Sequence, residues 1–90
     1  MNKARRKAIA DLIDRLDTLK AIADEIRSEV ETIKGAESEA FENLSESFQG
    51  SERGQAMEAA AYALEDAVGA MDEIGSTIDQ AVGYLNTASA

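Results

Sequence analysis

The feature that most constrains this chain is a long apolar repeat in its first half. Because the chain contains no Pro, nothing in the sequence interrupts a helix here. Apolar residues spaced by alternating steps of three and four lie along one side of an α-helix, in the a/d pattern of a coiled coil. The pattern predicts a helix over about residues 4–43, and its members are Ile9, Leu12, Leu16, Leu19, Ala23, Ile26, Val30 and Ile33.

A second apolar repeat with the same rhythm follows and predicts a helix over about residues 52–87. Its members are Met57, Ala60, Leu64, Ala67, Met71, Ile74, Ile78, Ala81, Leu85 and Ala88. Neighbouring small or apolar residues such as Val68 and Val82 widen this side of the helix. A stripe of that width is expected where a helix touches more than one neighbour. Gly75 lies at the edge of the stripe, where close backbone contact would explain a helix glycine.

The segment between the repeats, about residues 44–51, predicts a reversal of the chain. Gly50 is expected to adopt the left-handed conformation that ends many helices. Ser51 is expected to accept a hydrogen bond from an amide at the start of the next helix. The whole turn set is Phe41, Leu44, Phe48, Gly50, Ser51 and Gly54, with the two Phe and Leu44 expected to cover the end of the helices.

These elements predict one all-α domain over residues 1–90, a long antiparallel helical hairpin of coiled-coil type. A lone hairpin would leave one side of each broad stripe exposed, so we expect self-association into a four-helix bundle, as a homodimer or a higher oligomer. The residues expected to drive it are Leu12, Leu16, Leu19, Ile26, Val30, Ile33, Met57, Leu64, Met71, Ile74, Ile78 and Leu85.

Charge is divided unevenly along the chain, which has a net charge of -9. Residues 1–34 are nearly balanced, whereas Arg53 is the one basic residue after Lys34. The second helix therefore carries an acidic stripe that could bind a basic protein or could be an ordinary solvated surface. Its members are Glu58, Glu65, Asp66, Asp72, Glu73 and Asp79. Direct nucleic-acid binding is not expected, because it needs cationic side chains.

The residue types exclude most kinds of catalytic and metal site. There is no Cys and no His, so thiolate chemistry, imidazole chemistry and Glu-x-x-His metal sites are ruled out. Paired acids such as Asp72 and Glu73 lie mainly outside the apolar stripe, on solvated faces that do not provide the buried cleft that general acid or base catalysis needs. Glu37 interrupts the first stripe and is expected to reach solvent or to pair with Lys34 or Arg53, and the alternative is a buried polar residue that sets the register. We expect no enzyme activity, no cofactor and no metal.

The turn resembles a known family. Residues 41–58 read Phe-Glu-Asn-Leu-Ser-Glu-Ser-Phe-Gln-Gly-Ser-Glu-Arg-Gly-Gln-Ala-Met-Glu. This is similar to the F-x-N-L-P-E-S-L-Q-x-S-E-R-G-x-x-M-E signature of small acidic helical proteins of bacteriophages and prophages. Ser45 replaces the Pro of that signature and Phe48 replaces a Leu. The resemblance covers about a fifth of the chain and implies a viral origin and a helical hairpin, with no activity attached.

Together these observations favour a non-enzymatic phage-type interaction protein that binds a host protein, such as a host-defence antagonist acting through its acidic face. The alternatives are a structural or assembly bundle without a ligand, and a sponge for a small ligand such as a nucleotide. No uninterrupted apolar stretch resembles a membrane span. We therefore expect no membrane contact and a location in the cytoplasm of an infected or lysogenic bacterial host.

Overall fold

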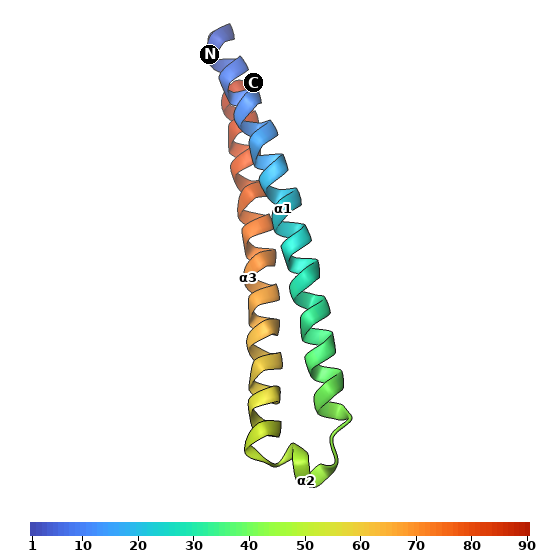
Figure 1. The fold of residues 1–90 in the computed structure, drawn as a ribbon. Coiled ribbons are helices and arrows are strands. Elements are labelled where there is room, and N and C mark those ends of the chain that lie inside the picture. Colours follow the sequence, from blue (N-terminus) through green and yellow to red (C-terminus); the bar gives the residue numbers. More distant parts are fainter.

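A computed structural model describes residues 1–90 as a hairpin of two long antiparallel helices (Figure 1). Helix α1 spans Lys3–Glu42, the short helix α2 spans Glu46–Gln49, and helix α3 spans Glu52–Ser89. The molecule is a rod of 68 × 15 × 13 Å, with both termini at one end and the turn at the other. The all-α prediction is confirmed, although the turn contains a helix that we did not predict. Neither long helix contains an apolar segment that could cross a membrane.

Each long helix begins at a side chain that caps its free amides. The Asn2 side-chain oxygen accepts a hydrogen bond from the Arg5 amide at 2.8 Å. Ser51 Oγ accepts one from the Gly54 amide at 3.2 Å, as expected from the sequence. Such caps typically stabilise a helix by about 1 kcal/mol. Both helix starts are therefore set by polar residues that directly precede the periodic segments.

A side chain from α2 donates hydrogen bonds to carbonyl groups at the end of α1. The Gln49 side-chain amide donates to the carbonyl oxygens of Phe41 at 3.3 Å and Leu44 at 3.1 Å. The last carbonyls of a helix have no partner within the helix itself. Gln49 therefore ties the short helix α2 to the end of α1.

Two expectations about the turn are wrong. Gly50 has φ −77° and ψ −8°, and no residue of the chain has a positive φ. The reversal is made by right-handed turns instead, since the Ser51 amide donates to the Phe48 carbonyl at 3.1 Å. Phe48 does not cover the helix ends, because its side chain is 63% exposed. Gln49 is the residue of α2 that reaches inward, and one step along a helix turns the preceding side chain away by about 100°.

Gly54 is the glycine that the turn requires. It is buried, and a Cβ at this position would lie 2.7 Å from the carbonyl carbon of Gln49 and nearer still to the carbonyl oxygens of Phe48 and Gln49. Those atoms belong to the backbone of α2 and its end, so they cannot rotate away. The first turn of α3 thus packs directly on α2, and any side chain at residue 54 would separate them.

The contact between α1 and α3 uses a different set of positions from the one expected. We assign heptad position a to Leu16, Ala23 and Val30 in α1 and to Leu64, Met71 and Ile78 in α3. These residues face the opposite helix and are buried or half-buried, as predicted. Their companions in the contact occupy position e, whereas the d residues Leu12, Leu19, Ile26 and Ile33 of α1 and Ile74 of α3 are exposed. The e residues are Ile13, Lys20, Arg27 and Lys34 in α1 and Ala61, Val68, Gly75 and Val82 in α3.

The core is correspondingly thin. Ala23, Val68 and Ile78 are the only apolar residues below a tenth of their full exposure. Gly75 is also buried, but a Cβ there would meet nothing closer than Lys20 Cε at 3.9 Å, an ordinary contact distance. The expectation of close backbone contact at Gly75 is therefore wrong. The aliphatic stem of Lys20 covers this glycine instead.

Replacing Gly54 by Ala should lower the free energy of unfolding by about 1–3 kcal/mol, the usual cost of forcing extra atoms into a closed contact. The matched control is Gly69→Ala in α3, where an added Cβ meets no atom within 4 Å. That control should raise the free energy of unfolding by about 1 kcal/mol, because Ala is the better helix former. Chemical denaturation followed by circular dichroism measures both. Equal effects of the two substitutions would contradict the close approach at Gly54.

Candidate interaction surfaces

One side of the hairpin carries a ladder of ion pairs between α1 and α3. The Lys20 ammonium lies 2.8 Å from Asp79, Arg27 Nε lies 2.5 Å from Asp72, and the Lys34 ammonium lies 3.9 Å from Glu65. The bases recur every seven residues along α1, and their acids recur every seven residues back along α3. This periodicity aligns the two helices in one register. We call these six residues the ion-pair face.

The two shortest pairs also stabilise the charged forms of their bases. The hydrogen bond from Lys20 to Asp79 raises the pKa of the lysine above its ordinary value of 10.5. The hydrogen bond to Asp72 raises the pKa of Arg27 in the same way. Both side chains are more than a third exposed, so solvent screens these pairs. Their main effect is therefore to select the register.

The ladder divides the predicted acidic stripe into two groups. Glu65, Asp72 and Asp79 are partnered by bases of the same chain. Glu58, Asp66 and Glu73 are exposed and take part in no ion pair. Only this second group, the free acids of α3, has its full charge available to an outside molecule.

The opposite side of the hairpin is apolar and uncovered. In an antiparallel pair, the e and b positions of both helices share one side, so the d positions share the other. On α1 the d residue Leu19 is 50% exposed and Ile33 is 56% exposed. On α3 the d residue Ile74 is 43% exposed. We call this surface the apolar face, and its large members are Leu12, Leu19, Ile22, Ile26, Ile33 and Ile74.

The structure thereby separates the residues expected to drive self-association into two sets. Seven of them form the contact within the hairpin: Leu16, Val30, Met57, Leu64, Met71, Ile78 and Leu85. The other five remain exposed on the apolar face: Leu12, Leu19, Ile26, Ile33 and Ile74. Ile22 also lies exposed among them, and the predicted a/d set did not include it. Its place at position g puts it beside the d column.

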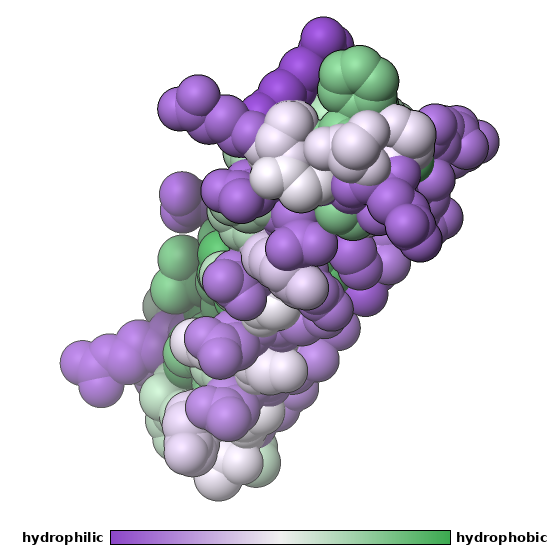
Figure 2. Space-filling model, turned by 90° about the horizontal axis from the view of Figure 1, so that it is seen from below, coloured by the Kyte–Doolittle hydropathy of each residue, from purple (hydrophilic) through white to green (hydrophobic).

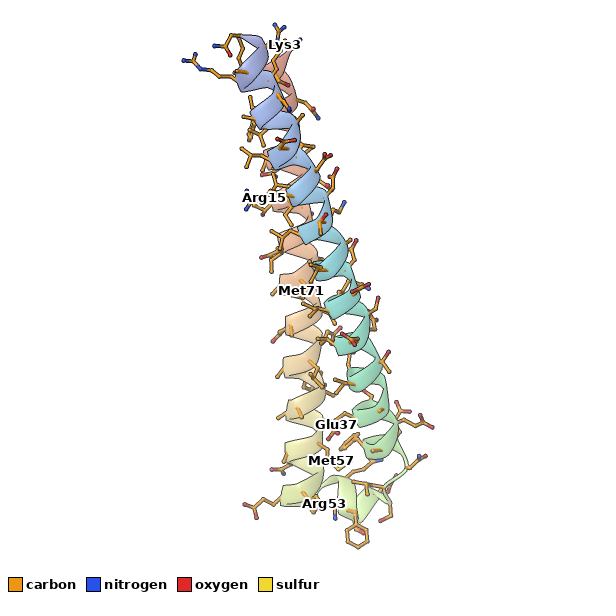
Figure 3. All side chains as sticks on the ribbon, turned by 45° about the horizontal axis from the view of Figure 1, so that its top comes forward. Lys3, Arg15, Glu37, Arg53, Met57 and Met71 are labelled. Carbon is orange, nitrogen blue, oxygen red and sulfur yellow. The ribbon has the colours of Figure 1, made fainter.

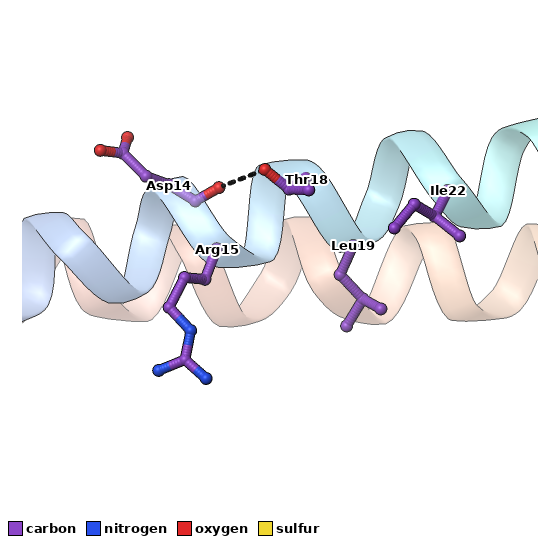
Figure 4. A pocket seen from close by; sticks show the side chains of 5 residues that line it. All are labelled: Asp14, Arg15, Thr18, Leu19 and Ile22. Atoms are coloured by element: carbon purple, nitrogen blue, oxygen red, sulfur yellow. Dashed lines mark hydrogen bonds between the residues drawn. The ribbon is translucent and has the colours of Figure 1, made fainter.

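The apolar face is hollowed near the open end of the hairpin. Leu12, Leu16 and Leu19 of α1 line a shallow groove with Leu85 of α3, and Arg15 lies at its edge. Figure 4 shows Arg15 and Leu19 projecting to the same side of α1, beside the hydrogen bond from Thr18 to the Asp14 carbonyl at 3.1 Å. Seen from the turn end, hydrophilic side chains cover much of the molecule, and hydrophobic atoms show along one side and in a separate group at the top of the view (Figure 2).

Glu37 and Met57 both lie toward the turn end of the hairpin, and both side chains are half-buried (Figure 3). No base lies within ion-pair distance of Glu37, because Lys34 pairs with Glu65. Glu37 is therefore a partly solvated acid, as expected, and the alternative of a fully buried register-setting residue is wrong. The expected pairing with Lys34 or Arg53 is not formed.

No cluster of three or more acids could hold a metal ion. The grooves are shallow and open, and the one lined by Asp24, Glu25, Ser28 and Glu29 has no apolar wall. What the molecule presents is surfaces: an apolar face, an ion-pair face and the free acids of α3. No protein-family model, no curated protein and no solved structure matches this chain.

The Lys20–Asp79 pair should make stability depend on alkaline pH. A base whose pKa is raised on folding contributes stability below its unfolded pKa and loses it as the pH rises through the folded pKa. Lys20→Met keeps the aliphatic stem and removes the charge, so it should lower the unfolding temperature at about pH 8 and have a smaller effect at about pH 12. In an Asp79→Asn background, this pH dependence of the Lys20→Met effect should vanish. An effect of the same size at both pH values would exclude the pair as its cause.

Proposed function

We propose that this chain is a non-enzymatic interaction protein whose working form is a bundle of self-associated hairpins. The observation that carries the proposal is the apolar face, a column of large aliphatic side chains that the hairpin itself leaves in water. Monomeric soluble proteins seldom expose contiguous apolar surface on this scale. A second copy offers the complementary surface directly, since a two-fold dimer pairs one patch with itself.

The size of the face suits a dimer. From Leu12 to Ile33 it runs 21 residues along α1, or about 32 Å. Two packed helices are about 20 Å wide, so each copy offers on the order of 600 Å². The pair would bury roughly 1,200 Å² in total, which is at the lower end of specific protein interfaces. Four helices packed in this way would form a four-helix bundle.

The thin core gives the hairpin a reason to associate. Three buried apolar residues supply little of the burial that offsets chain entropy in a domain of this size. Covering the apolar face adds to the burial within the hairpin. Folding and association should therefore be coupled, and stability should rise with protein concentration.

Replacing Ile26 by Asp should separate the hairpins, because Ile26 lies on the apolar face and is 43% exposed in the single hairpin. The substitution places a charge in the middle of the apolar face, where burial without a partner costs several kcal/mol. We expect the dissociation constant to rise at least ~100-fold, equivalent to about 2.7 kcal/mol. Light scattering at several concentrations measures the molar mass, and thermal melts measure the unfolding temperature of the wild type, which should increase with concentration.

Ala21→Asp is the matched control for Ile26→Asp. Ala21 is exposed on α1, on the side away from the apolar face, so the same added charge should leave the dimer intact. A wild-type chain that is monomeric at all concentrations would overturn the proposal. Equal dissociation by both variants would show that added charge alone is responsible.

We further propose, following the resemblance of the turn to phage proteins, that the bundle docks on a basic protein of a bacterial host. The free acids of α3 support this role, because Glu58, Asp66 and Glu73 have no base of their own chain to neutralise them. Complementary charge would speed and orient such an encounter. A purely structural bundle would need no such surface, which makes the two roles separable.

Reversal of the free acids should abolish host binding if they form the docking surface. A variant with Glu58, Asp66 and Glu73 changed to Lys should lose a basic partner that wild type retains from host lysate, while its molar mass by light scattering stays that of the wild-type dimer. The control variant changes Asp14, Asp17 and Glu25 of α1 to Lys, which alters the net charge equally and should retain the partner. Identical captures by all three proteins would remove the acids from the docking role and favour a structural or assembly function.

A further inference from the structure

The two ends of the hairpin carry opposite charge. At the end that holds the termini, Lys3, Arg5, Arg6 and Lys7 are all exposed, and the neighbouring residues 83–90 include no charged side chain. At the turn end, residues 37–58 hold one base, Arg53, and six acids: Glu37, Glu39, Glu42, Glu46, Glu52 and Glu58. Lys3 and Arg53 mark these opposite ends in Figure 3. The rod therefore has a basic end and an acidic end.

The apolar face lies between these ends, and its centre determines which residues a second copy would meet. It runs from Leu12 to Ile33, so its midpoint on α1 is beside Ile22. The ladder of ion pairs places Ile74 of α3 within about one helical turn of that level. A copy turned end over end about this midpoint would bring residues 3–7 opposite residues 38–42. Those four bases would then lie level with Glu39, Glu42 and Glu58, and Arg5, at position d, would be the one on the same side as the apolar face.

A second copy placed side by side in the same direction would bring like charges together. The four bases would face the four bases of the other copy, and the acidic turns would face each other. The ends are about 45 Å or more apart, far beyond the screening length of about 10 Å in ordinary buffer. Each end therefore responds only to the charge next to it, and that charge favours the end-over-end arrangement.

The position of Arg15 also favours the end-over-end arrangement. It lies at the edge of the apolar groove and belongs to none of the four ion pairs. In the end-over-end arrangement it would lie level with the stretch of α3 between Asp66 and Glu73 of the other copy. With both copies in the same direction it would lie level with Tyr84, where α3 has no acid from residue 80 onward.

We infer that the second copy on the apolar face lies end over end, with the two-fold axis crossing the rod near Ile22 and the basic end of each copy against the acidic turn of the other. The inference rests on the self-association proposed above and adds its direction. It makes the interface closed, since each copy uses the whole apolar face once. It also neutralises the basic end without any other partner.

A distance between identical labels separates the two directions. The chain has no Cys, so Ala59→Cys accepts a single nitroxide at an exposed, uncharged position on α3. In the end-over-end dimer, the two labels are 35 residue rises apart, or about 52 Å along the rod. In a dimer whose two copies point in the same direction, the two labels are no farther apart than the width of the bundle, about 30 Å. Pulsed electron paramagnetic resonance measures this distance.

Ser76→Cys is the control label, because it lies level with the proposed axis and should give a distance of about the bundle width in either arrangement. A long distance at residue 59 with a short one at residue 76 supports the inference. A short distance at both sites in a chain that is dimeric by light scattering overturns the direction and leaves the proposed function standing. A monomeric chain overturns both.

Discussion

The packing of α1 against α3 is the interaction on which the rest of the molecule depends. Two helices can cover only one side of each other, and here the covered sides are the a and e positions. The e positions of α1 are largely bases, so the contact combines a narrow apolar strip with a ladder of ion pairs. The d positions then fall outside the contact on the opposite side. The uncovered apolar face is thus a direct consequence of which flank carries the bases.

The turn has a role that is mechanical rather than chemical. Gln49 donates hydrogen bonds to carbonyls at the end of α1, and Ser51 caps the start of α3. Gly54 lets the first turn of α3 pack on the backbone of α2. These three residues are among those that the turn shares with the phage signature it resembles. The shared letters therefore correspond to contacts that build the hairpin. A partner-binding role is not needed to account for them.

Much of the fold could be predicted from the sequence because periodicity reports directly on which side of a helix is apolar. The two helices and the Ser51 cap followed from that rule and from the chemistry of helix starts. The choice between positions d and e could not be predicted in the same way, because Lys20 and Arg27 count as polar in a pattern although their stems pack in the contact. The pairing of Asp72 and Asp79 with those bases was missed for the same reason. The seven-residue spacing of the bases in α1 and of the acids in α3 was the feature of the sequence that could have predicted these pairs.

Gly54 also restricts how this sequence can diverge. Most positions of α1 and α3 require only a broad class of side chain, so aliphatic or polar residues can replace one another there over evolutionary time. Residue 54 admits no side chain at all, and Gln49 and Ser51 are restricted by the particular atoms they reach. Homologues should therefore drift apart along the helices while keeping Gln, Ser and Gly at this spacing. Distant homologues would then be recognisable mainly by residues 49–54, in which Gln49, Ser51 and Gly54 keep their spacing.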